Sequence, residues 1–134
     1  MNSSADLIFP ADYQGAALAS EDGSVGRRGL VTSLLEEMLE SGPRPRAVYG
    51  AGPERMLLAV QELVTRFEVP FQLSFERYMK CGFGLCGQCA LDGSGVQVCT
   101  EGPVLERQDL EGVTDLGQPH RTASGRRPAT SQKT

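Results

Sequence analysis

The residues of this 134-residue chain best suited to chemistry are its four cysteines. They are Cys81, Cys86, Cys89 and Cys99. Three thiolates from one short loop and a fourth from a later segment match the ligand spacing of plant-type [2Fe–2S] clusters. Gly82, Gly84 and Gly87 suit such a loop, because glycine adopts the positive φ angles that turn backbone amides toward sulfur. The spacing therefore predicts that the four cysteines hold one [2Fe–2S] cluster.

Two other uses of the thiols remain open. A structural zinc site usually takes its cysteines from two Cys-x2–4-Cys knuckles with a longer spacer, whereas here three cysteines share one loop. A zinc site made by the four cysteines would make the chain a non-redox structural or regulatory module. Two disulfides would suit a secreted protein. Residues 1–6 show neither the basic start nor the apolar run of a secretory signal, so we expect a reducing, cytoplasmic setting.

Charge is unevenly distributed along the chain. Residues 1–115 contain all 17 acidic residues and nine of the 13 basic ones, a net charge of −8, and residues 116–134 carry +4. A body this acidic repels phosphate, which excludes a nucleic-acid-binding core. No run of 18 apolar residues occurs, so the sequence predicts no membrane-spanning helix.

Alternating strand and helix patterns precede the cysteines. We predict strands at 16–20, 46–49 and 71–75, a helix from about 30 to the Gly-Pro stop at 42–43, and a second helix over about 53–67. This order is typical of a parallel sheet with helices on its faces. The predicted fold class is α/β, with a partial nucleotide-binding-like sheet of about three strands and two helices before a small, loop-rich cluster module.

Four segments resemble one known family. Residues 79–89 (MKCGFGLCGQC) and 98–105 (VCTEGPVL) resemble the cluster module of the electron-transfer subunit of dihydroorotate dehydrogenase B, in the ferredoxin-reductase-like group. Residues 19–26 (ASEDGSVG) and 48–56 (VYGAGPERM) resemble the same family, and the resemblance covers about residues 16–110. It implies a protein that passes electrons between a flavin and a partner dehydrogenase of pyrimidine biosynthesis.

The resemblance also implies what must come from elsewhere. The flavin-binding β-barrel and the Gly-rich pyrophosphate turn of this group have no counterpart in the sequence. We therefore expect FAD and NAD(P)H only through a partner chain, if at all. The chain would be one component of a multi-subunit oxidoreductase, in a hetero-oligomer with a flavoprotein or dehydrogenase subunit and with no complete active site of its own. A piece of a longer reading frame is a third interpretation.

One motif is implied as a remnant of a nucleotide site. In the wider group a strand runs into a Cys-Gly-Pro turn beside the nicotinamide, and here Gly50, Gly52 and Pro53 occupy such a turn, with Ala51 in place of the cysteine. The same residues suit a plain strand-to-helix turn, since proline favours the first position of a helix. Both interpretations remain open.

The resemblance and the composition together divide the chain into three parts. Residues 1–75 are expected to form a truncated half of a nucleotide domain. Residues 76–116 are expected to form the cluster-binding module, which has little apolar material to hold it apart from its metal. Residues 117–134, rich in Gly, Pro, Ser, Thr and Arg, are predicted to be a disordered basic tail.

Overall fold

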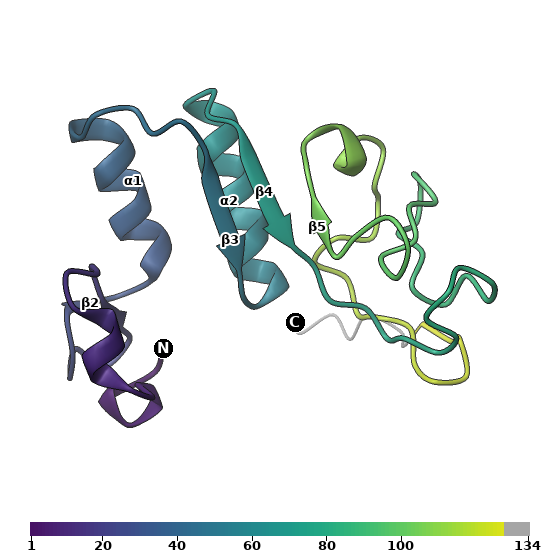
Figure 1. The fold of residues 1–134 in the computed structure, drawn as a ribbon, viewed down its shortest axis with the longest axis horizontal. Helices are drawn as coiled ribbons and strands as arrows, with labels where there is room; N and C mark the ends of the chain where they lie inside the picture. The colour runs from purple at the N-terminus through teal and green to yellow at the C-terminus, as the bar shows by residue number, and fades with distance from the viewer. Residues whose placement is uncertain (128–134) are drawn as a thin grey trace, which may run out of the picture. The chain divides into compact units, whose positions relative to one another are not determined.

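The polypeptide divides between Pro45 and Arg46 into two units, Met1–Pro45 and Arg46–Thr134 (Figure 1). The structure is a computed structural model and describes residues 1–127. No helix within these residues has the length and the apolar character needed to cross a membrane.

The first unit carries two very short strands and one helix. Two 3-10 turns, Ser4–Asp6 and Pro10–Tyr13, precede β1 (Ala19–Ser20) and β2 (Arg27–Arg28), which pair in parallel. Helix α1 (Val31–Ser41) follows and ends at the Gly-Pro stop that the sequence indicated. The amphipathic pattern thus located this helix to within a residue or two.

Strand β1 does not join the sheet that we predicted for it. Among the described residues it pairs with β2 in a separate two-stranded sheet. Gly26 permits this pairing, because a Cβ atom built there would lie 2.2 Å from the carbonyl oxygen of Leu18. With no side chain at Gly26, the backbone returns to β1, and the N–H of Arg27 donates to the Leu18 carbonyl at 2.8 Å.

The second unit contains a three-stranded sheet in the order β3–β4–β5. Strands β3 (Val48–Ala51) and β4 (Phe71–Ser74) are parallel, and helix α2 (Glu54–Arg66) connects them and packs on them (Figure 1). The predicted parallel strand–helix–strand unit is therefore present. Strand β5 (Val104–Leu105) comes from beyond the last cysteine and pairs antiparallel with β4.

The pairing of β5 with β4 changes the expected domain division. We expected one part to end at residue 75 and the cluster module to begin at 76. Instead, the module returns to the sheet and lies in the same unit as β3, α2 and β4. Antiparallel hydrogen bonds between the segments before and after the cysteines account for this.

An apolar core runs from α2 into the cysteine module. The helix buries one face, formed by Leu57, Val60, Leu63 and Val64. Within and beside the module, Phe75, Leu91, Val98 and Leu105 are at most 1% exposed. The expectation that the module has little to hold it apart from a metal is therefore wrong, since these side chains supply an apolar core.

Part of the predicted tail, residues 117–127, contacts the cysteine module. These residues have no strand or helix, and their contacts with the module are polar. The half-buried carboxylate of Asp92 forms ion pairs with Arg121 and Arg127. The buried carboxylate of Asp115 forms an ion pair with Arg127. The rest of the predicted tail, 128–134, lies outside the described residues.

Candidate metal centre

The cysteine loop begins a few residues beyond the end of β4. Gly82, Gly84 and Gly87 have φ angles of 78°, 81° and 64°, the left-handed conformations expected from the sequence. Any other residue type is strained at such φ values. The changes of backbone direction at these three glycines let the loop fold around its first cysteine, Cys81.

Backbone amides surround the sulfur of Cys81. The N–H of Cys86 donates to the Cys81 Sγ at 3.4 Å. The amides of Phe83 and Cys86 lower the pKa of Cys81 to about 6, and the amide of Leu85 contributes further. Because hydrogen bonds to an anion favour the charged form, these amides favour the thiolate of Cys81, which is the form that binds a metal.

A short antiparallel turn brings Cys89 and Cys99 together. Ala90 forms an isolated bridge with Gln97, and the N–H of Val98 donates to the Cys89 carbonyl at 3.4 Å. Burial raises the pKa of Cys89, and the adjacent Cys99 thiol raises it further. Cys89 is 3% exposed and so is shielded from water, whereas Cys99 is only partly buried.

The four cysteines therefore come as two pairs, Cys81 with Cys86 and Cys89 with Cys99. All four thiols are free, so the structure contains neither of the disulfides considered above. Residues 1–127 hold no group of three or more His, Cys, Asp or Glu side chains placed around one metal ion.

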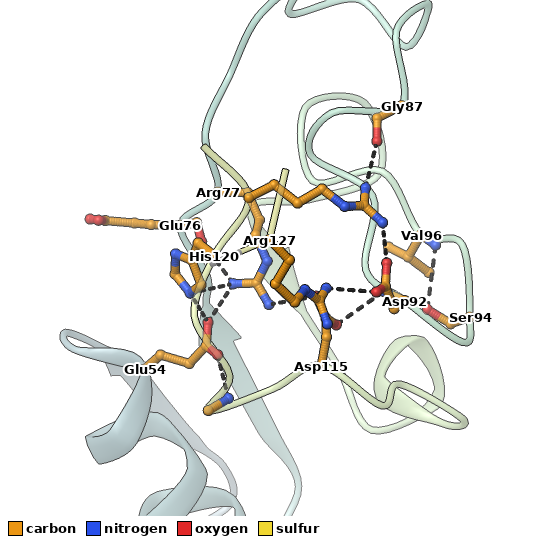
Figure 2. Close-up of polar contacts among 12 residues, drawn as sticks. Glu54, Glu76, Arg77, Gly87, Asp92, Ser94, Val96, Asp115, His120 and Arg127 are labelled. Atoms are coloured by element: carbon orange, nitrogen blue, oxygen red, sulfur yellow. Dashed lines mark hydrogen bonds and ion pairs between the residues drawn. The ribbon is translucent and has the colours of Figure 1, made fainter. Parts of the chain in front are cut away.

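A buried charge network lies beside the module, and sequence reasoning missed it. The guanidinium of Arg77 contacts the Glu54 carboxylate, and its Nη2 lies 3.8 Å from Asp115 Oδ2. The three side chains are only 4%, 12% and 7% exposed. Figure 2 shows Arg77 and His120 directed at the Glu54 carboxylate, with His120 Nε2 at 2.9 Å from Oε2.

The environment of Glu54 favours its charged form. Burial raises the pKa of Glu54, but the amide of Gly117 and the guanidinium of Arg77 outweigh burial and hold that pKa below its usual range. The Gly117 N–H donates to Oε1 at 2.5 Å. His120 contributes a further hydrogen bond. The members lie far apart along the chain, so no local pattern could have revealed the network.

A cavity of about 440 Å³ lies at the turn between β3 and α2. It is lined by Gly52, Pro53, Glu54, Leu57, Glu76 and His120. Gly50, the third residue of the suggested nucleotide-site remnant, does not line it. A Cβ atom at Gly50 would lie 2.7 Å from the Leu73 Cδ2, so this glycine permits close packing instead.

Sequence comparison assigns the module to a known family. Residues 76–111 match the family described as the iron–sulfur cluster binding domain of dihydroorotate dehydrogenase B. The chain is 47% identical over 109 residues to a Methanopyrus kandleri protein named a probable dihydroorotate dehydrogenase B (NAD⁺) electron transfer subunit. It is 44% identical over 126 residues to a protein of the same name from Methanothermobacter thermautotrophicus. Residues 76–111 thus match an iron–sulfur cluster binding domain family, and most of the chain is similar to dihydroorotate dehydrogenase B electron transfer subunits.

The chain matches only part of these family members. The two matches cover 81% and 91% of this chain but 40% and 46% of the relatives, so the chain spans less than half of their length. A solved structure of an NADH-dependent reduced ferredoxin–NADP oxidoreductase, studied for flavin-based electron bifurcation, is also similar. The TM-score is 0.57 at 28% identity, over 68% of this chain and 33% of that one.

The family domain contains all four cysteines and stops short of the tail. It includes Asp92 but neither Asp115 nor residues 117–127. The tail arginines therefore lie outside the part of the chain that this family domain describes, although their partner Asp92 lies within it.

Proposed function

We propose that this chain is an iron–sulfur electron-transfer subunit. Its ligands are those named from the spacing: Cys81, Cys86, Cys89 and Cys99. The observation that carries the proposal is the arrangement of these thiols in two pairs within a domain of the iron–sulfur cluster family. When bound, a [2Fe–2S] cluster supplies one-electron oxidation and reduction, which no amino-acid side chain here provides.

Each pair of cysteines would bind one of the two irons. Cys81 and Cys86 would hold one iron, and Cys89 and Cys99 the other. The amides directed at Cys81 stabilise negative charge on the exposed side of the site, and the burial of Cys89 excludes water from the other side. Such hydrogen bonds and differences in exposure are the means by which proteins adjust cluster potentials.

We further infer a hetero-oligomer. The relatives are named as electron transfer subunits of an NAD⁺-dependent dihydroorotate dehydrogenase. We propose that a partner chain supplies the flavin and that electrons pass between this flavin and a partner dehydrogenase of the dihydroorotate type. FAD and NAD(P)H would then be bound through the partner. Thiolate ligands must remain reduced to bind iron, which suits a cytoplasmic setting.

The cavity beside Gly52 and Pro53 supports this division of labour. Its lining includes the exposed carboxylate of Glu76, which repels the pyrophosphate of a dinucleotide. We therefore propose that any nucleotide-site remnant at this turn binds NAD(P)H too weakly to act alone. Calorimetric titration of the isolated chain with NADH should give no saturable heat, and micromolar binding would contradict this.

The test of the electron-transfer proposal is metal analysis of protein purified without oxygen. We expect visible absorption bands with about two irons and two sulfides per chain. A colourless protein with one zinc per chain would contradict the proposal and would favour the structural or regulatory alternative. The analysis should also be run on the Cys86→Ser variant, because loss of iron there ties the metal to these ligands.

A further inference from the structure

The segment 117–127, here called the strap, binds the backbone of the cysteine loop. The Nη1 of Arg121 donates to the carbonyl of Gly87 at 3.1 Å. In the opposite direction, the Nε2 of Gln88 donates to the carbonyl of Thr122 at 2.8 Å. Gly87 and Gln88 are the two residues between the second and third cysteines, so the strap holds the centre of the ligand loop.

Two carboxylates anchor the strap to the module. The Asp92 carboxylate accepts a hydrogen bond from Nη2 of Arg121 and another, at 2.6 Å, from Nη2 of Arg127. Asp115 lies 3.1 Å from the same Arg127 nitrogen, and Figure 2 shows Arg127 between the two carboxylates. Asp115 also accepts the backbone N–H of Asp92 at 3.0 Å. The anchors are therefore fixed to each other as well as to the arginines.

The strap begins at the buried charge network. Glu54, at the start of α2, accepts the N–H of Gly117 and contacts His120. The strap thus runs from the first turn of α2 to the carbonyl of Gly87. Its contacts at both ends involve charged groups, which form stronger hydrogen bonds than neutral pairs.

We propose that the strap is a positioning device for the cysteine loop and that Arg121 is its positioning residue. The loop needs this because its three glycines give it more conformational freedom than any other residue type would. Arg121 restricts that freedom at Gly87 and brings a cation to the loop. This inference rests on the proposed function for its effect on the cluster, since reduction adds negative charge that a nearby cation stabilises.

The decisive experiment compares Arg121→Gln with Arg126→Gln in the full chain. Both variants lose one positive charge from the strap. Among the described residues, no ion pair is observed for the exposed Arg126 side chain, so Arg126→Gln is a matched control. Amide hydrogen exchange on reduced, metal-free protein should be several-fold faster over residues 81–89 in Arg121→Gln than in the wild type, and unchanged in Arg126→Gln.

Two further measurements separate this role from general destabilisation. Asp92→Asn removes the negative charge that Arg121 contacts, so it should also accelerate exchange over 81–89, and adding Arg121→Gln to it should have little further effect. In cluster-loaded protein, Arg121→Gln should lower the midpoint potential more than Arg126→Gln does. Thermal melting of each variant shows whether the fold is retained.

Each outcome decides the proposal. Equal exchange over 81–89 in Arg121→Gln and Arg126→Gln would overturn the positioning role. Faster exchange with equal potentials in the two variants would overturn the effect on the cluster. If the wild type binds no iron, the proposed function fails, but the exchange comparison on metal-free protein still tests the strap independently.

Discussion

Removing the buried guanidinium of Arg77 should destabilise the second unit strongly. Arg77→Met keeps the length of the side chain but leaves the carboxylates of Glu54 and Asp115 without the buried cation between them. Breaking a buried ion pair from one side typically costs about 3–5 kcal/mol. Two donors of Arg77, Nε and Nη2, have no hydrogen-bond partner among the described residues, so their removal recovers part of that cost. We therefore expect a loss of about 3 kcal/mol.

The assay is urea unfolding followed by circular dichroism at pH 7, with thermal melting beside it. A loss of about 3 kcal/mol corresponds to a fall in melting temperature of roughly 15 °C for a unit of this size. The control is Arg27→Met, which breaks the exposed ion pair of Arg27 with Glu37. Because that pair lies in solvent, its loss should cost less than about 1 kcal/mol.

The stability loss in Arg77→Met should depend on pH, and this dependence tests the role of Glu54. Arg77→Met removes both the hydrogen bond and the charge by which Arg77 lowers the pKa of Glu54, so that pKa rises and the variant takes up a proton at higher pH than the wild type. The wild-type advantage comes from ionised Glu54, so it is full at neutral pH and shrinks as the pH falls through 4.5 and below. A loss under about 1 kcal/mol at pH 7, or one that is the same at pH 7 and pH 4, would refute the reasoning.

Three single sites give further predictions. Cys86→Ser should abolish iron binding and leave a colourless protein, and full iron content by metal analysis would remove Cys86 from the ligand set. Leu91→Ala should cost about 2–5 kcal/mol in urea unfolding because Leu91 is fully buried, whereas Leu85→Ala, at 79% exposed, should change stability by less than about 0.5 kcal/mol. Glu54→Gln should flatten the decline in wild-type stability below pH 4.5, and an unchanged acid profile would show that Glu54 carries none of it.

Local patterns in the sequence predicted the elements that are determined locally. The apolar periodicity located α2 within one residue at each end, because its buried face repeats with the helical period. The alternation at residues 71–75 located β4 in the same way. The cysteine spacing and the three glycines predicted a loop with positive φ angles, and these were confirmed.

Contacts between distant segments were not predictable in this way. The pairing of β1 with β2 depends on a close approach between Gly26 and Leu18. The three-stranded sheet depends on β5, which pairs with β4 from beyond the cysteines. Neither pairing has a local signature in the sequence. Composition alone does not predict the contacts of the tail, because a polar, basic segment is read as disordered unless its acidic partners are known.

The net charges of the body and the tail do not locate the contacts between them. An acidic body followed by a basic tail suggests attraction, but the net charges alone do not say where the two meet. In the structure the positive charges of Arg121 and Arg127 meet Asp92 and Asp115, which are among the less exposed acidic side chains. Partial burial reduces the screening that makes most surface ion pairs weak. The contacts of the tail therefore form where its charges reach carboxylates with restricted access to water, and those carboxylates flank the cysteine loop.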